Sequence, residues 1–174
     1  MVRRAVVTAA VLWFFAVSGA RGEEGVRLLM DGEYFKEVHR ILRGAGKSIH
    51  IAVFSIRRYA EYPDSPSNVL IRDLVEARGR GVEVYVVINV DRWKDDNAGN
   101  IAAGRMLEEG GVSVRYDSLE KTSHAKLLTV DGEVSVVGST NWSYHSLAKN
   151  REANVLIEDE ETAAQVREYI RSIR

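Results

Sequence analysis

Residues 123–152 read S-H-A-K-L-L-T-V-D-G-E-V-S-V-V-G-S-T-N-W-S-Y-H-S-L-A-K-N-R-E. Six of them fit the pattern H-x-K-x4-D-x6-G-S-x-N, namely His124, Lys126, Asp131, Gly138, Ser139 and Asn141. Asp131 and Gly132 lie between two apolar runs, which is a strong signal for a β-hairpin. Because a strand alternates its faces, His124 and Lys126 are expected on the same side of the first strand. The second strand, Glu133 to Val137, ends at Gly138, where the chain can turn back toward the imidazole.

The chemistry of this hairpin follows from the side chains that it gathers at one corner of the sheet. His124 is a nucleophile, Lys126 is a fixed cation, and Ser139 and Asn141 are neutral hydrogen-bonding groups. A phosphoryl group needs such a set as negative charge shifts on its oxygens. A histidine and a lysine alone on an exposed strand are more often solvated surface, so the prediction depends on the complete spacing. That spacing predicts a phosphodiester-cleaving site, in which Asp131 at the turn and Gly138 are structural.

The complete spacing also resembles the signature of a known family, the phospholipase D superfamily. The flanking segments K-T-S-H-A-K-L-L-T-V-D and N-R-E-A-N-V are similar to those of its small single-motif bacterial endonucleases. The resemblance is dense from Ser123 to Ile157 and looser, but continuous, from Val26 to the end. It implies an α/β fold, a three-layer α/β/α sandwich with a mixed central β-sheet. The alternation of strand and helix periodicity from Gly25 onward also predicts an α/β layered domain.

The resemblance further implies a role for each residue of the site, with no metal and no cofactor. His124 would form a phosphohistidine, and Lys126 and Asn141 would hold the non-bridging oxygens. Ser139 matches the family's hydroxyl beside the imidazole. Glu152 matches its carboxylate that holds the other imidazole nitrogen and fixes the tautomer.

One motif supplies only one histidine, whereas cleavage through a covalent histidine needs a second group to protonate the leaving oxygen. His145 is the only other histidine nearby, and the sequence places it in a loop after Trp142. Single-motif members of the family pair as homodimers. A two-fold axis through the site would supply the second His124, so a homodimer with the active site at its interface is predicted.

The N-terminal residues predict an export signal. Arg3 and Arg4 precede an apolar run from Ala5 to Val17, and small residues follow up to Ala20, where cleavage is expected. The run is shorter than the roughly 20 residues that span a bilayer, and an uncleaved anchor is the alternative. The mature protein is therefore expected to be periplasmic or secreted. Residues 21–174 are long enough for one catalytic domain and too short for two.

The composition limits the kinds of partner and chemistry. The chain has 24 Lys and Arg against 25 Asp and Glu, and loss of Arg3 and Arg4 leaves 22 against 25, a net charge of −3. Such a protein is not a general polyanion binder, so a nucleic-acid surface has to be a local basic patch. The absence of cysteine excludes disulfides, thiolate metal sites and a cysteine nucleophile.

Two loops that follow strand ends are candidates for such a patch. The first carries Arg57 and Arg58 beside Tyr59 and Tyr62, a pattern that suits phosphates and stacked bases, although plain surface is the alternative. The second, residues 91–100, carries Arg92 and Lys94. Its aspartates lack the spacing of a calcium loop and bring no histidine, so no metal site is predicted there.

The remaining elements are expected as follows. Strands are predicted at Val26–Met30, Ser48–Phe54, Val82–Val90, Val112–Tyr116 and Ala153–Ile157. Helices are predicted from a cap at Asp31 to Gly44, from Ser65-Pro66 to Gly79, from about Ile101 to Glu109, and from a cap at Asp159 with Val166, Tyr169, Ile170 and Ile173 facing inward. His39 and His50 fall within a helix and a strand and are interpreted as structural.

The predicted function is a metal-independent phosphodiesterase, most simply a nonspecific endonuclease on DNA or RNA. The first alternative is a phospholipase D or cardiolipin hydrolase, because relatives of this shape cleave phospholipids. The lack of an amphipathic membrane-binding helix beyond the signal favours nucleic acid. The second alternative is a catalytically idle nucleic-acid-binding protein, which the intact motif argues against.

Overall fold

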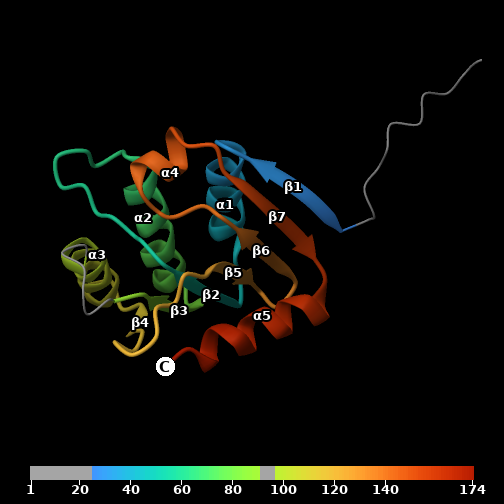
Figure 1. Cartoon of the computed structure of the whole chain (residues 1–174). Helices are drawn as coiled ribbons and strands as arrows, with labels where there is room; N and C mark the ends of the chain where they lie inside the picture. Colours follow the sequence, from blue (N-terminus) through green and yellow to red (C-terminus); the bar gives the residue numbers. More distant parts are fainter. Residues whose placement is uncertain (1–24, 91–96) are drawn as a thin grey trace, which may run out of the picture.

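The computed structural model describes residues 25–90 and 97–174 (Figure 1). The predicted export signal, residues 1–20, lies outside this part of the chain. So do Arg92 and Lys94, two of the four predicted substrate-binding residues.

A seven-stranded mixed sheet forms the centre of the described chain, with the strand order β1-β7-β6-β5-β2-β3-β4. Strands β2, β3 and β4 are parallel, and every other neighbouring pair is antiparallel. The strands are β1 (Val26–Met30), β2 (Ser48–Val53), β3 (Glu83–Ile88), β4 (Ser113–Tyr116), β5 (Lys126–Val130), β6 (Val134–Gly138) and β7 (Ala153–Glu158). The predicted mixed sheet is thus confirmed.

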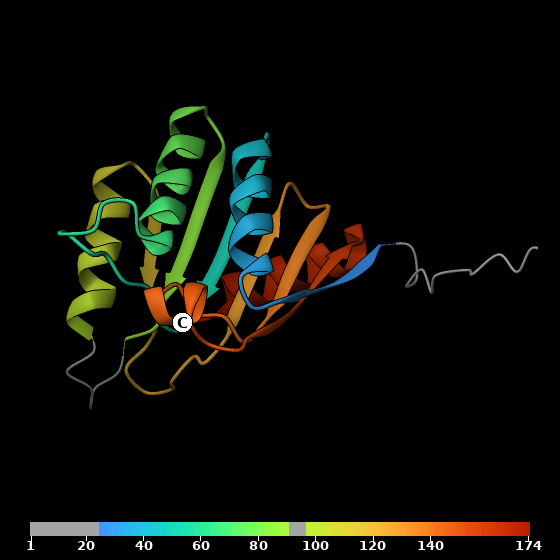
Figure 2. The ribbon, with the colours of Figure 1, turned by 90° about the horizontal axis from the view of Figure 1, so that it is seen from above.

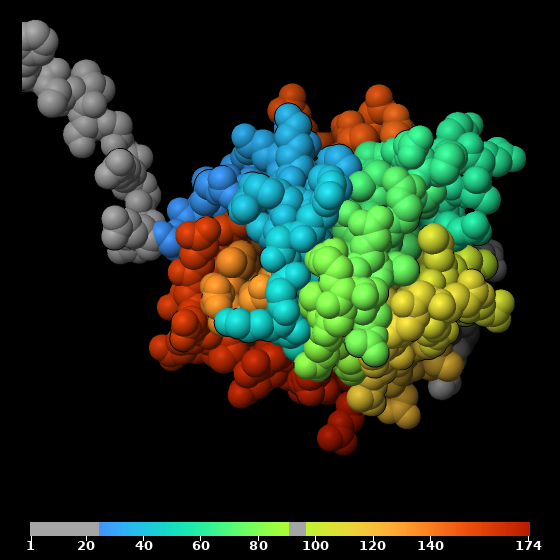
Figure 3. Space-filling model, turned by 180° about the vertical axis from the view of Figure 1, so that it is seen from behind, coloured from blue at the N-terminus to red at the C-terminus, as the bar shows by residue number. Residues whose placement is uncertain are grey.

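Helices cover both faces of this sheet. They are α1 (Glu33–Gly44), α2 (Pro66–Gly79), α3 (Asn97–Glu109), α4 (Tyr144–Ala148) and α5 (Glu160–Ser172). Figure 2 shows α1, α2 and α3 on one face and α5 on the other, and Figure 3 shows those three helices side by side over their face. The predicted three-layer α/β/α architecture is confirmed.

The alternation of side chains along the strands separates two cores. In β2, Ile49, Ile51 and Val53 belong to the larger core under α1, α2 and α3. Ala52, on the opposite face, packs with Val87 and with Ile170 of α5 in the smaller core. The parallel strand β3 is therefore apolar on both faces, as strands covered on both sides are.

The hairpin of β5 and β6 forms as the sequence predicts. Asp131 and Gly132 have φ values of 57° and 75°, the left-handed backbone that a tight hairpin turn requires. The Asp131 carboxylate also accepts hydrogen bonds from the backbone amides of Gly46, Lys47 and Ser48, at 2.9, 2.7 and 2.9 Å. These bonds fix the turn to the start of β2, the neighbouring strand.

Three predicted details of this region and of α1 are wrong. Strand β5 begins at Lys126, so His124 lies in the segment before the strand. His145 lies in the short helix α4 and not in a loop, because Ser143 caps that helix with its side chain. The cap of α1 is Gly32, since the Asp31 carboxylate instead accepts a hydrogen bond from the backbone amide of Glu152, at 2.9 Å.

Two helices also differ from the prediction. Helix α3 begins at Asn97 and not near Ile101, and its first turn is held by the buried amide of Asn100, which bonds to backbone groups of Phe54, Ile56 and Asn89. In α5, Tyr169 is 55% exposed, whereas Ile170 is buried and Val166 and Ile173 pack around it. The cap at Asp159 is confirmed.

Candidate active site

His124 and Lys126 lie together at the start of β5. The Lys126 ammonium lies 3.0 Å from Nδ1 and 3.2 Å from Nε2 of His124, and donates to the His124 carbonyl oxygen at 2.7 Å. Although His124 precedes the strand, its imidazole is therefore beside the cation, as the motif requires.

Phe54 forms the apolar side of this pair. Its ring centroid lies 4.4 Å from that of the His124 imidazole, and the Lys126 ammonium lies 4.9 Å from the same ring. Sequence reasoning missed Phe54 as a site residue. The strand register explains its place, because Val53 pairs with Lys126 across β2 and β5 and Phe54 is the next residue.

The pKa of Lys126 depends on its partial burial and on the nearby carboxylate of Glu152. Partial burial lowers the pKa of the Lys126 ammonium below its usual value, and the negative charge of Glu152 opposes this effect. Glu152 therefore acts electrostatically on the same end of the sheet.

The Glu152 carboxylate is held by hydrogen bonds from the side chains of Ser139 and Asn150. Ser139 donates its hydroxyl to Glu152 Oε2, and Asn150 donates to Oε1 at 3.2 Å. The Ser139 hydroxyl also accepts from the backbone amide of Ala153 at 3.1 Å. These bonds join the end of β6 to the start of β7 and fix the carboxylate next to the site. The predicted role of Glu152 on the imidazole stays a prediction.

Gly138 has a steric reason to be glycine. It pairs with Asn154 across β6 and β7, and a Cβ at this position would lie 2.1 Å from Asn154 Oδ1. The buried Asn154 amide bonds to Leu29 and Thr140, so it cannot move aside without breaking these bonds. Gly138 thus lets the chain approach β7 closely just before Ser139.

Asn141 is half-buried and precedes the buried Trp142. Its neighbour Trp142 is buried and donates through Nε1 to the Tyr34 hydroxyl at 3.0 Å, and its backbone amide donates to Ser55. The side-chain oxygen of Asn141 is buried without a hydrogen-bond partner in the part of the chain that the structure describes. Such an unsatisfied group is costly, and it is one of the exceptions that functional sites tolerate.

His124 also opens onto a cavity of about 300 Å³. Its walls come from the segment before β5 and the C-terminal end of α5, and include Lys121, Tyr169 and Arg174. Sequence reasoning missed Lys121 and Arg174 as cations near His124. Lys121 lies only three residues before His124 in the same segment, whereas Arg174 reaches the cavity through the packing of α5 against β5.

The arginine pair of the first predicted loop lies beside the motif. The backbone of Ile56 bridges to Trp142, and the amide of Arg57 donates to the Trp142 carbonyl at 2.9 Å. The Arg57 side chain is half-buried against Gly99 of α3, where a Cβ would lie 1.9 Å from its guanidinium. Arg58 is exposed.

The two other histidines have partners of their own. His39 Nδ1 lies 2.6 Å from the Asp73 carboxylate, which is buried between α1 and α2. His50 is buried and contacts Arg171 of α5, and burial, followed by the charge of Arg171, lowers the pKa of its imidazole.

The described residues hold neither a metal-binding cluster nor a membrane-spanning helix. Across residues 25–90 and 97–174, no three side chains of histidine, cysteine, aspartate or glutamate converge in a way that would hold a metal ion. In the same ranges, no helix has the length and apolar character needed to cross a bilayer.

A histidine–lysine hairpin on a mixed sheet between helical layers defines a phospholipase D-like domain. The model of a family described as "Cardiolipin synthase, PLD-like domain" matches residues 38–174, and the chain belongs to this family. The resemblance of the sequence to the phospholipase D superfamily is thereby confirmed.

Known relatives include enzymes named for cardiolipin. The chain is 30% identical over 154 residues to cardiolipin synthase 1 of Staphylococcus epidermidis, covering 86% of this chain and 30% of the relative. It is 34% identical over 122 residues to the mitochondrial cardiolipin hydrolase of Xenopus laevis, covering 68% of this chain and 50% of that protein. The chain thus spans half or less of the length of these curated relatives.

Solved structures of similar size share the fold. The phospholipase D family member Nuc from Salmonella typhimurium has a TM-score of 0.72 and 25% identity, covering 85% of this chain and 92% of its own. NucT from Helicobacter pylori has a TM-score of 0.65 and 16% identity, covering 85% and 94%.

Proposed function

We propose that this protein is a metal-independent phosphodiesterase that acts on polynucleotides through a phosphohistidine at His124. The observation that carries the proposal is the Lys126 ammonium within 3.2 Å of both imidazole nitrogens, inside an intact family motif. Arg57 and Arg58 beside the rings of Tyr59 and Tyr62 support a polynucleotide over a lipid, because such a set suits phosphates and stacked bases.

The proposed reaction has two displacements. An imidazole nitrogen of His124 attacks phosphorus, the bond to the leaving oxygen breaks, and a second group protonates that oxygen. Water then attacks the phosphohistidine, the phosphorus–nitrogen bond breaks, and the second group takes the proton of the water. Lys126 and Asn141 hold the non-bridging oxygens, supplying the charge that other nucleases take from a divalent metal.

The second group is proposed to be His124 of a second copy of the chain. An isologous contact would bring both copies of the residue to the axis, together with two copies of Lys126. Sedimentation of the active protein should show two chains. A fully active monomer would contradict the shared site and leave the second group to be found within one chain.

We also propose that residues 21–174 are the mature catalytic domain, exported to the periplasm or medium. The sequence from Arg3 to Ala20 supports this. The mass of the protein recovered from the periplasm or the medium should lack the first twenty residues. Recovery of the full mass in the membrane fraction would favour the uncleaved anchor.

The nucleophile can be tested directly. His124→Ala should remain folded and lose nearly all activity, and the native enzyme should yield an acid-labile phosphate bound to His124 after rapid quenching. Turnover of the alanine variant at the wild-type rate would refute the assignment.

A second candidate is hydrolysis of a phospholipid, because the two relatives described above are named for cardiolipin. Parallel assays on DNA, RNA and cardiolipin vesicles separate the two. Cleavage of cardiolipin without cleavage of either polynucleotide would overturn the nuclease proposal.

A further inference from the structure

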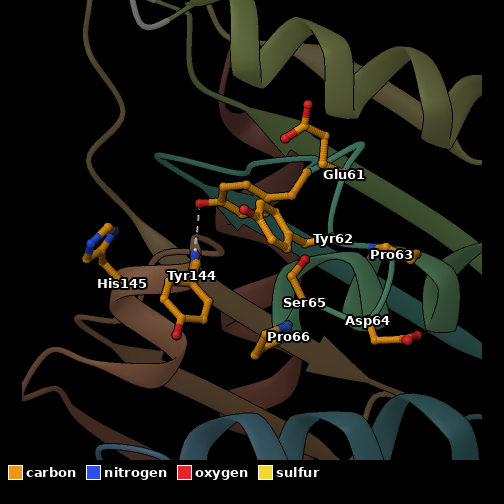
Figure 4. A pocket seen from close by; sticks show the side chains of 9 residues that line it. Glu61, Tyr62, Pro63, Asp64, Ser65, Pro66, Tyr144 and His145 are labelled. Carbon is orange, nitrogen blue, oxygen red and sulfur yellow. Dashed lines mark hydrogen bonds between the residues drawn. The ribbon is translucent and has the colours of Figure 1, made fainter.

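A second cavity lies between the loop that precedes α2 and the start of α4. It has a volume of about 720 Å³ and is formed by residues 59–66, which precede and begin α2, and by the start of α4 (Figure 4). The size falls within the range of small-ligand pockets. Its walls are mostly rings, from Tyr59, Tyr62, Pro66, Tyr144 and His145.

These rings are exposed but held in place. Tyr62 is 66% exposed and Tyr144 is 38% exposed, so a ligand can reach both. The Tyr59 hydroxyl accepts a hydrogen bond from the backbone amide of Tyr144 at 3.0 Å, which ties the two walls together. Figure 4 shows the carboxylates of Glu61 and Asp64 directed away from Tyr144. Although Glu61 and Asp64 are among the lining residues, the rings offer flat surfaces, which suit a planar ring.

The cavity is also close to the candidate active site along the chain. One wall follows Phe54, which packs on His124, and the other follows Asn141 of the motif. Two residues separate Asn141 from Tyr144, so their Cα atoms lie at most about 11 Å apart even in extended chain. A group bound in this cavity can therefore belong to the same molecule as a phosphodiester at His124.

Cations lie beside the rings. The Lys149 ammonium lies 5.8 Å from the centroid of the Tyr144 ring, and the exposed Arg58 precedes Tyr59. Positive charges next to aromatic rings are the arrangement with which proteins bind single strands, because the charges hold phosphates and each base stacks on a ring.

We propose that this cavity binds one unstacked base of a single-stranded polynucleotide whose neighbouring phosphodiester lies at His124. The inference rests on the proposed nuclease function and deepens it. A base inside a duplex has to be unpaired and unstacked at a cost of a few kcal/mol before it can enter, so single strands are the preferred substrate.

Binding can be measured without turnover in the full chain carrying His124→Ala. The probe is a short single-stranded DNA with 2-aminopurine, whose fluorescence falls when it stacks on a ring, and a matched strand with abasic positions. Tyr62→Leu keeps an apolar side chain and removes the ring, and Tyr62→Phe keeps the ring. Leu28→Ala is the control truncation, because Leu28 is 59% exposed on the edge strand β1 and does not line the cavity.

In the His124→Ala background, Tyr62→Leu should weaken binding of the strand with bases by about fivefold to a hundredfold, the range expected for one stacked base. It should bind the abasic strand within about twofold of its parent. Tyr62→Phe and Leu28→Ala should bind the strand with bases as the parent does. Tyr144→Leu, which keeps the backbone bond to Tyr59, should repeat the Tyr62→Leu result.

Four outcomes would overturn the proposal. Equal weakening on both strands would mean that Tyr62 supports the fold or contacts the backbone. Undiminished DNA binding by Tyr62→Leu, with a loss of cardiolipin turnover in Tyr62→Ala, would place an acyl chain in the cavity. If the unmodified chain cleaves no polynucleotide, the proposed function falls and the base site with it. Efficient cleavage without any effect of Tyr62 would remove the base site alone.

Discussion

Replacing Asp131 tests whether this residue of the motif is architectural. Its carboxylate accepts three backbone hydrogen bonds at 2.7 to 2.9 Å. A hydrogen bond to a charged group contributes about 1.5–3 kcal/mol, which sets an upper limit of roughly 5–9 kcal/mol for the three. Gly46 and Lys47 are exposed and Ser48 is half-buried, so water can replace part of this. We therefore expect Asp131→Ala to lose about 2–4 kcal/mol of unfolding free energy.

Two other substitutions separate the hydrogen bonds from the backbone strain. Asp131 has a φ of 57°, which alanine adopts at a cost of about 1 kcal/mol relative to glycine. Asp131→Gly should therefore be about 1 kcal/mol more stable than Asp131→Ala. Asp131→Asn tolerates this φ and keeps one acceptor oxygen, so it should be the least destabilised of the three variants.

The pH dependence gives an independent check. Partial burial opposes ionisation of Asp131, but the three amide donors together hold the pKa of its carboxyl below the usual value. A depressed pKa in the folded state means that the stabilisation is present above the unfolded pKa of about 3.9 and is lost as the pH falls through the folded pKa. The difference between wild type and Asp131→Ala should therefore shrink below about pH 4.

Urea unfolding at pH 7 and at pH 3 measures these differences in stability. Activity at a temperature where each variant is folded measures whether Asp131 takes part in the chemistry. We expect kcat to be preserved in folded Asp131→Asn. Equal stability of all four proteins would refute the role of the three hydrogen bonds. A large loss of kcat in a fully folded asparagine variant would move Asp131 into the chemistry.

Three further predictions concern the site. Replacing Arg57 and Arg58 together by alanine should weaken DNA binding and flatten its salt dependence, by about 0.9 in the log–log slope for each phosphate that is no longer neutralised, and an unchanged slope in a salt titration would exclude these contacts. Glu152→Gln removes the negative charge that raises the pKa of Lys126, so the alkaline limb of the pH–rate profile should move to lower pH. A limb that stays in place would show that Glu152 does not act on Lys126. Activity should survive an excess of chelator, whereas an absolute need for added magnesium or calcium would contradict the proposed mechanism.

Local signals in the sequence were sufficient for the elements that depend on local geometry. The hairpin was predictable because Asp131 and Gly132 both take left-handed backbone that few residues adopt. The cap at Asp159 was predictable for a similar reason, since its side chain accepts from Thr162 three residues later. Asp31 shows where such reasoning fails. Its carboxylate bonds to the amide of Glu152, a partner 121 residues away that no local rule can reveal.

The contrast between local and long-range contacts also separates the site residues that were predicted from those that were missed. The motif residues were found because their spacing is a property of one hairpin and the turn after it. Phe54 and Arg174 were missed because each reaches His124 from a different element, through the pairing of β2 with β5 or the packing of α5. Lys121 lies only three residues before His124, but lysine is common on surfaces, so its residue type alone gave no reason to single it out.

The strand register explains the spacing of the motif. Leu127 pairs with Val137 across the hairpin, so by continuation Lys126 lies opposite Gly138, the residue that pairs with Asn154 of β7. Lys126 of β5, Gly138 of β6 and Asn154 of β7 thus form one row across the sheet, and β7 begins just after Glu152. A shift of one residue would turn every side chain of a strand to the other face and would separate the ammonium from Ser139 and Glu152. Asp131 and Gly138 therefore need no contact with substrate to be part of the motif, because the turn and the close approach that they permit set the register on which the proposed chemistry of His124 depends.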